Sequence, residues 1–181
     1  MSLSKAQIAG MIDHTLLAPE ATANDIRRMC AEALEFSVAA VCVSPTMVEV
    51  AVREVVGFPS GAHLAEAKAL EAKRSCEAGA HEIDMVISLR LAKEGEWKQL
   101  EHEVADVRRN TTGLLKVIIE SAALTDVEIV QACTSAVNGG ADFVKTSTGF
   151  HHAGGASLEA VRLMRHTVGN QVGVKASGGV R

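Results

Sequence analysis

Aromatic residues are scarce in this chain, which has no tyrosine, one tryptophan and four phenylalanines among its 181 residues. A protein that stacks single-stranded bases needs a platform of aromatic side chains, and none is indicated here. The formal net charge is -4 and no run of basic residues occurs, so the positive surface of a nucleic-acid-binding protein is missing as well. The sequence therefore favours a small-molecule partner over a nucleic acid.

Long apolar runs and paired cysteines are also missing. No stretch approaches the roughly 20 apolar residues that a membrane-spanning helix needs, and the first residues lack the apolar segment of a signal peptide. Cys30, Cys42, Cys76 and Cys133 lie far apart without a Cys-x-x-Cys pair. This spacing argues against a zinc knot and a disulfide framework, and it indicates reduced thiols. We therefore expect a cytoplasmic protein with no membrane partner.

What the chain does contain is a regular alternation of two hydrophobic patterns. Amphipathic stretches that predict helices each run into a short apolar stretch typical of a buried strand. Two of these helices open with capping boxes at Thr22 and Thr125. The other predicted helices span 63–78, 91–109 and 157–168, and the strands span 38–43, 82–87, 114–119, 143–145 and 172–175. Because no low-complexity linker interrupts this order, we predict one domain, residues 1–181, with β/α units around a parallel sheet.

Charged residues recur at similar places in the predicted strands. The separation along the chain is 32 residues from Asp84 to Lys116, 29 from Lys116 to Lys145 and 30 from Lys145 to Lys175. Each separation corresponds to one β/α unit. Barrel enzymes gather their chemistry at the C-terminal ends of the strands, so we expect these four side chains to converge.

The region of the third strand breaks this rhythm. Cys42 and Phe58 are only 16 residues apart, and the helical pattern of residues 46–54 runs into 55–59 without a turn residue. A parallel crossover needs a dozen or more residues, and a closed barrel normally has eight strands, of which we find seven. We therefore hypothesise that about a dozen residues near strand three and a last β/α segment are missing.

Two similar runs point to amine chemistry. They are Lys145-Thr146-Ser147-Thr148-Gly149 and Lys175-Ala176-Ser177-Gly178-Gly179. Burial of an ammonium in an apolar strand favours the neutral amine, which is the form that adds to a carbonyl, and a second cation nearby disfavours protonation further. Lys145 is therefore the predicted Schiff-base nucleophile and Lys175 the lysine that tunes it. The alternative is that each lysine only pairs with a carboxylate such as Asp84 or Asp13.

Asp84 is the predicted proton carrier of this chemistry. Schiff-base reactions need protons delivered and removed, and a carboxylate beside the lysines can do this, directly or through a water. The alternative is a purely structural counter-ion. Glu82 ranks lower because it lies nearer the start of the same strand. None of the seven histidines has a His-x-His or His-x-x-x-His spacing, so we expect neither a metal nor a cofactor.

Glycines at the ends of the last two predicted strands suggest a phosphate site. Backbone N–H groups of Gly149, Gly178 and Gly179 can approach an anion closely, and Arg181 would add a bidentate cation. Barrels often bind phosphate in the loops after their last strands. The alternative is that these glycines are ordinary turn residues.

The chain resembles the deoxyribose-phosphate aldolase family over nearly its whole length. The matching stretches are IDHTLL (12–17), VCVSP (41–45), VGFPSG (56–61), EIDMV (82–86), LKVIIE (115–120), FVKTSTGF (143–150) and VKASGGVR (174–181). The resemblance implies a (β/α)8 TIM barrel, which would be incomplete here near strand three and at its last segment. It also implies a class I aldolase that reversibly cleaves 2-deoxy-D-ribose 5-phosphate into acetaldehyde and D-glyceraldehyde 3-phosphate.

The resemblance implies roles for individual residues. Lys145 would form the Schiff base, Lys175 would tune its pKa, and Asp84 would shuttle protons with a water. The substrate pocket would be lined by Asp13, Thr15, Cys42, Lys116 and Thr148, and the phosphate would be held by Gly149, Gly178, Gly179 and Arg181. The partners would be small phosphorylated sugars and aldehydes, and a homodimer is expected.

Two other functions remain open from the sequence. One is another Schiff-base aldolase with a different acceptor, which would share the lysine but would not predict both lysine-centred runs. The other is a phosphate-ligand-binding barrel without turnover.

Overall fold

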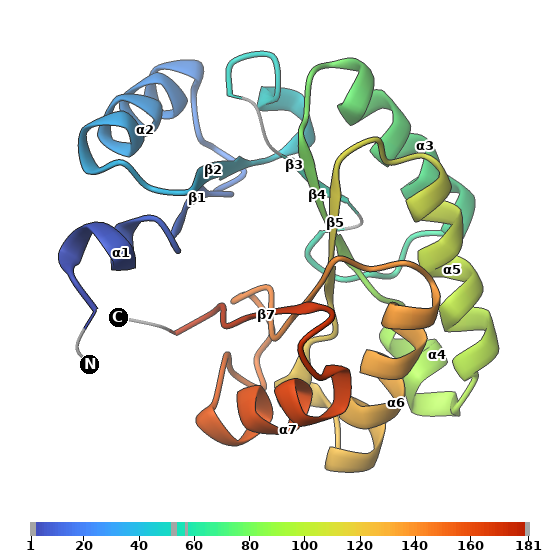
Figure 1. Ribbon diagram of the computed structural model, residues 1–181. Helices are drawn as coiled ribbons and strands as arrows, with labels where there is room; N and C mark the ends of the chain where they lie inside the picture. The colour runs from blue at the N-terminus through green and yellow to red at the C-terminus, as the bar shows by residue number, and fades with distance from the viewer. Residues whose placement is uncertain (1–2, 52–53, 57, 180–181) are drawn as a thin grey trace.

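The computed structural model describes residues 3–51, 54–56 and 58–179. Within these ranges, seven strands form one parallel sheet in sequence order. They are β1 (Asp13–Leu16), β2 (Ala40–Val43), β3 (Glu54–Val56), β4 (Glu82–Val86), β5 (Leu114–Ile118), β6 (Phe143–Lys145) and β7 (Gly173–Lys175). The sheet curls around (Figure 1). Its first and last strands come close enough for Lys175 on β7 to form an ion pair with Asp13 on β1. Seven parallel strands curled in sequence order are the arrangement of a TIM-type β/α barrel.

The helices lie outside the strands (Figure 1). They are α1 (Lys5–Ala9), α2 (Ala23–Phe36), α3 (Ala65–Glu77), α4 (Leu89–Glu94), α5 (Trp97–Arg109), α6 (Asp126–Asn138) and α7 (Leu158–Val168), with short 3-10 turns at Pro45–Met47 and Ser121–Ala123. The predicted capping boxes are present, with Thr22 bonded to Asp25 and Thr125 to Glu128. No helix in the described part of the chain is long and apolar enough to span a bilayer.

Two helix predictions were wrong. The stretch 91–109 is divided into α4 and α5, because Gly95 adopts a left-handed conformation (φ 73°) that ends α4 before Glu96 starts the next helix. Among the described residues of the stretch 46–54, the helical structure is a 3-10 turn at the start, and β3 already begins at Glu54. The apolar residues of that stretch serve the core instead, since Val48 and Ala51 are buried.

Two expectations fall on residues that the structure leaves undescribed. The hypothesised gap near strand three concerns the steps from residue 53 to residue 57, and both of these end residues are outside the described ranges. The predicted phosphate ligand Arg181 is outside them as well. Both expectations therefore stay predictions.

The register of the sheet refines the expected convergence of charged residues. Asp84 pairs directly with Lys116, and Lys145 with Lys175. Between β5 and β6, however, Lys145 pairs with Ile118 and not with Lys116. Equal spacing along the chain therefore did not mean equal height, because the strands of a barrel are staggered against one another. Lys145 lies two residues further towards the C-terminal end of the barrel than Lys116.

Candidate active site

Lys145 ends β6 and its amine meets a carboxylate from another strand. Its Nζ donates a hydrogen bond of 2.7 Å to Oδ2 of Asp84 on β4. Both residues are buried, each with 4% of its surface exposed. Because β5 separates β4 from β6, the contact spans two strand positions inside the curled sheet. The site therefore lies within the barrel.

Lys175 on β7 stands between two carboxylates. Its Nζ forms an ion pair with Asp13 on β1 and lies 4.0 Å from Oδ2 of Asp84. Burial lowers the pKa of Lys175, and the nearby charges of Lys145 and Lys116 lower it further, while Asp84 and Asp13 oppose this. Lys175 and Lys145 thus share the counter-ion Asp84 and repel each other.

Asp13 joins Lys175 to a second lysine. Its Oδ2 is 3.0 Å from Nζ of Lys116 on β5, and Lys116 also forms an ion pair with Glu82. Burial alone would raise the pKa of Asp13, but Lys175 and Lys116 hold it well below its ordinary value. The result is a chain of alternating charges that runs Glu82, Lys116, Asp13, Lys175, Asp84, Lys145.

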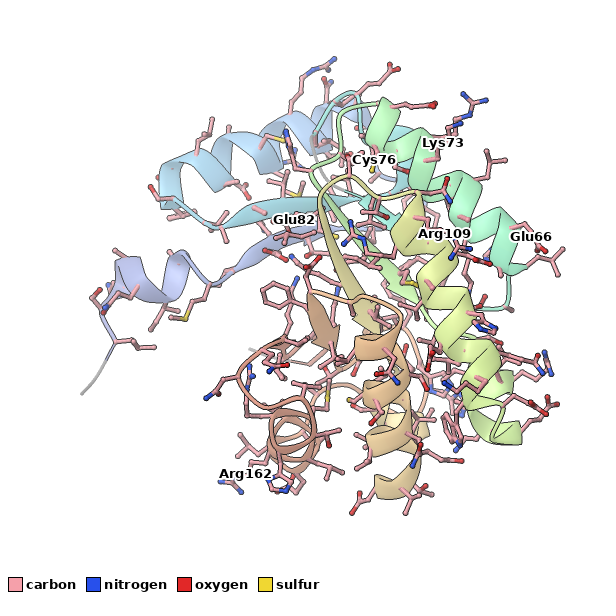
Figure 2. The ribbon with its side chains drawn as sticks, turned by 45° about the vertical axis from the view of Figure 1, so that its right-hand side comes forward. Glu66, Lys73, Cys76, Glu82, Arg109 and Arg162 are labelled. Carbon is pink, nitrogen blue, oxygen red and sulfur yellow. The ribbon has the colours of Figure 1, made fainter. Side chains whose placement is uncertain are left out.

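The place of Glu82 in this chain was underrated from the sequence. Figure 2 shows Glu82 among the strands, whereas Glu66, Lys73 and Arg109 project from the outer helices. Its position two residues before Asp84, at the level of Leu114 on β5, is what brings it to Lys116. The same alternation that aimed Asp84 inward was the available signal.

The predicted pocket residues of β1 and β2 lie side by side. Thr15 and Cys42 are partners in the register of these strands. The hydroxyl of Thr15 donates to the carbonyl of Asp13, at 3.0 Å. Burial raises the pKa of Cys42 to about 12, and Asp84 contributes to the rise. The thiol therefore stays protonated and, with Val86, is part of a small apolar cluster rather than a nucleophile.

The loops after β6 and β7 are in contact at Gly149 and Gly178. A Cβ added at Gly178 would lie 3.0 Å from Cα of Gly149, and both glycines have positive φ angles. Gly179 follows with φ 75° and open space where a Cβ would stand. Thr146 ties the two loops together, because its hydroxyl donates to the carbonyl of Ser177 and accepts from the N–H of the same residue. The three glycines predicted to bind the phosphate therefore lie next to one another.

Thr148, a predicted pocket residue, directs its hydroxyl to a carboxylate of the protein. It is buried and its hydroxyl donates to Oε2 of Glu120, at 2.6 Å. Glu120 was not predicted as a site residue. The signal for it was a charged residue placed directly after the apolar run 117–119.

In the part of the chain that the structure describes, no group of three or more histidine, cysteine, aspartate or glutamate side chains is arranged to hold a metal ion. The four cysteines are free thiols.

A family model described as DeoC/LacD family aldolase matches residues 8–181. The chain belongs to this family. Similar proteins named deoxyribose-phosphate aldolase include one from Corynebacterium diphtheriae, 54% identical over 98% of this chain and 85% of the relative. Another from Kocuria rhizophila is 53% identical over 99% of this chain and 86% of the relative. The chain is therefore an aldolase, a carbon–carbon lyase, as the two lysine-centred runs predicted.

Solved structures of DeoC/LacD aldolases confirm the barrel fold. The deoxyribose phosphate aldolase from Aeropyrum pernix, described as tetrameric, matches with a TM-score of 0.85 and 32% identity, over 98% of this chain and 80% of that one. A second structure, described as an aldolase, matches with a TM-score of 0.91 and 34% identity, over 96% of this chain and 82% of that one.

Proposed function

We propose that this aldolase reversibly cleaves 2-deoxy-D-ribose 5-phosphate into acetaldehyde and D-glyceraldehyde 3-phosphate through a Schiff base on Lys145. The observation that carries the proposal is the buried hydrogen bond between Lys145 and Asp84, with Lys175 beside the same carboxylate. An amine, a proton carrier and a second cation are the groups that such a reaction needs. The names of the relatives supply the substrate.

The reaction begins at the amine of Lys145. Its lone pair adds to the C1 aldehyde of the open-chain sugar, and the carbinolamine loses water to give an iminium ion. The iminium withdraws electrons from the C2–C3 bond. When the C3 hydroxyl loses its proton, this bond breaks, C3 becomes the aldehyde of D-glyceraldehyde 3-phosphate, and an enamine remains on the lysine. Protonation of C2 and hydrolysis then release acetaldehyde and restore the amine.

Asp84 is the proton carrier in this proposal. Its carboxylate lies within hydrogen-bond reach of the reacting nitrogen, so it can take up a proton during addition and return it to the carbinolamine hydroxyl as water leaves. A bound water can extend this reach to C2 and to the C3 hydroxyl. Asp13 fixes the position of Lys175 by an ion pair, and Asp13 is itself paired with Lys116.

Lys175 is the second cation that favours the neutral amine of Lys145. Both amines face the same carboxylate, since Oδ2 of Asp84 lies 2.7 Å from Nζ of Lys145 and 4.0 Å from Nζ of Lys175. The shared carboxylate Asp84 then has one ammonium to balance, that of Lys175, while the amine of Lys145 reacts.

The substrate's phosphate is assigned to the loops after β6 and β7. Backbone N–H groups near Gly149, Gly178 and Gly179 can donate to its oxygens, and Arg181 would add charge-assisted bonds. Close contact between Gly149 and Gly178 supports this assignment, because only glycine allows such an approach of two backbones.

Trapping the intermediate tests the proposal. The chain is incubated with acetaldehyde and borohydride, the adduct is located by mass spectrometry, and cleavage of deoxyribose 5-phosphate is followed by release of glyceraldehyde 3-phosphate. We expect one adduct, on Lys145, and none after Lys145→Met. Reduction without an adduct at Lys145 would rule out the mechanism, and an adduct without cleavage would point to a different acceptor or to binding without turnover.

The proposal includes a homodimer and a cytoplasmic location. The Aeropyrum pernix protein is described as a tetramer, so dimer and tetramer are both compared with the monomer. The mass of the purified protein under native conditions would distinguish one, two and four copies. Free thiols at all four cysteines suit a reducing compartment, and fractionation of cells checks the location.

A further inference from the structure

Glu120 is a buried carboxylate that the reaction above does not use. It lies two residues after the end of β5, with 1% of its surface exposed. Its backbone is left-handed, with φ 55° and ψ 55°, a conformation that is unfavourable for a residue with a Cβ. Strain of this kind persists where the surroundings enforce it, and it is concentrated at functional sites.

Among the residues that the structure describes, the side-chain hydrogen bonds of Glu120 all come from Thr148. The N–H of Thr148 is shared between the two carboxylate oxygens, at 3.3 and 3.2 Å, and the Thr148 hydroxyl donates to Oε2 at 2.6 Å. Within the described residues, Glu120 forms no ion pair. A buried charge without a counter-ion is costly unless strong donors satisfy it, so the carboxylate and the loop of Thr148 hold each other in place.

This contact fixes the loop on both sides of Gly149. The Thr148 hydroxyl, whose proton is directed to Glu120, accepts a hydrogen bond from the N–H of Phe150, at 3.1 Å. Gly149 itself is exposed, and its N–H has no acceptor among the described residues. A Cβ at Gly178 would lie 3.2 Å from that nitrogen, so the glycine there keeps the N–H open to a ligand.

We infer that Glu120 is a positioning residue for the phosphate of the substrate, acting through Thr148 to hold the loop 148–150 so that the N–H of Gly149 faces the anion. The inference rests on the proposed function. It also assigns the hydroxyl of Thr148 to the protein scaffold and not to a substrate contact. A carboxylate is required because it only accepts hydrogen bonds, whereas the amide of glutamine would turn an N–H₂ group towards the donors of Thr148.

The test is Glu120→Gln, assayed with phosphorylated and unphosphorylated 2-deoxyribose. We expect KM for deoxyribose 5-phosphate to rise about tenfold, the change that loss of one buried hydrogen bond corresponds to. The rate for unphosphorylated deoxyribose and the rate of borohydride trapping with acetaldehyde on Lys145 should stay within about twofold, since neither needs the phosphate loop. The inference would be overturned if KM for deoxyribose 5-phosphate and the two rates all changed by the same factor. It would also be overturned if none of the three changed.

A binding measurement separates this inference from the proposed reaction. Inorganic phosphate is titrated into the wild-type chain and the variant, and its dissociation constant is measured by calorimetry. We expect binding to be about tenfold weaker in Glu120→Gln, whatever the turnover of the wild-type chain. Failure of wild-type cleavage would therefore reject the proposed function alone, whereas equal phosphate affinity in both proteins would reject the role of Glu120.

Two further variants guard against a general loss of structure. Glu103→Gln is the matched control, because Glu103 is also buried and also accepts from a backbone N–H, that of Ser88, but on the outer side of the barrel. It should lower stability without changing the preference for the phosphorylated sugar. Thr148→Val removes the hydroxyl link from the other side, and it should reproduce the KM effect even if Glu120→Gln folds poorly. The double variant should be no worse than either single one, and additive losses would contradict a shared pathway.

Discussion

Lys145 and Asp84 are 61 residues apart in the chain, yet the amine of one lies 2.7 Å from the carboxylate of the other. Neither residue belongs to a strand next to the other's, so the curvature of the sheet creates the contact. In this position the carboxylate of Asp84 can accept a proton directly from the amine of Lys145.

Asp84→Asn is expected to lower kcat by about 10²- to 10⁴-fold, the range found for loss of a positioned acid–base group. The asparagine preserves shape and can still accept a hydrogen bond, but it cannot carry a proton. Steady-state kinetics with deoxyribose 5-phosphate measure the effect. Asp126→Asn, an exposed change in the first turn of α6, is the control and should leave kcat unchanged. Wild-type kcat in Asp84→Asn would show that the carboxylate is only a counter-ion.

Lys175→Met is expected to slow adduct formation at neutral pH by about tenfold or more. Without the second cation, Lys145 keeps its proton more readily, so the rise of the trapping rate with pH should move to higher pH. Borohydride trapping with acetaldehyde across a pH series gives this profile. Lys73→Met, an exposed change on α3, is the control. An unshifted profile in Lys175→Met would remove Lys175 from the mechanism.

Asp13→Asn should destabilise the protein in a pH-dependent way. The pKa of Asp13 lies well below its ordinary value in the folded chain, because Lys175 and Lys116 outweigh the effect of burial. Its ionised form therefore contributes stability that is complete above the unfolded pKa of about 3.9 and is lost as the pH falls towards the folded pKa. The difference in free energy of unfolding between wild type and variant should be largest above about pH 5 and should narrow below about pH 4.

Urea denaturation at a series of pH values measures this difference. Glu77→Gln, which alters an exposed pair with Arg74, should change the free energy of unfolding little at any of these pH values. The assigned ion pairs would be contradicted if the difference in free energy of unfolding between wild type and Asp13→Asn stayed constant from pH 6 to pH 3.

Lys68→Ala should lower the free energy of unfolding by about 3–5 kcal/mol, the range for loss of one partner from a buried ion pair. Lys68 is fully buried, and its Nζ donates to Oε1 of Glu103 and to the carbonyl of Val86, each at 2.8 Å. The variant would leave Glu103 charged and unpaired between α3 and α5. Thermal and chemical unfolding measure the loss. Lys73→Ala on the same helix is exposed and should change stability by less than about 0.5 kcal/mol, so equal effects would refute the role of burial.

The sequence by itself determined the order of elements and the residue types of the site. Caps at Thr22 and Thr125 and the apolar strand runs act locally, so they could be read without knowledge of distant contacts. A lysine in an apolar strand is unusual at any position because of the cost of burial, which is why Lys145 and Lys175 stood out. Tertiary structure decided how these side chains meet. The stagger of β6 against β5, the contact of Glu82 with Lys116 and the hold of Glu120 on Thr148 depend on the curvature of the barrel and on the reach of each side chain across it. Because these contacts join residues far apart in the chain, no local pattern encodes them.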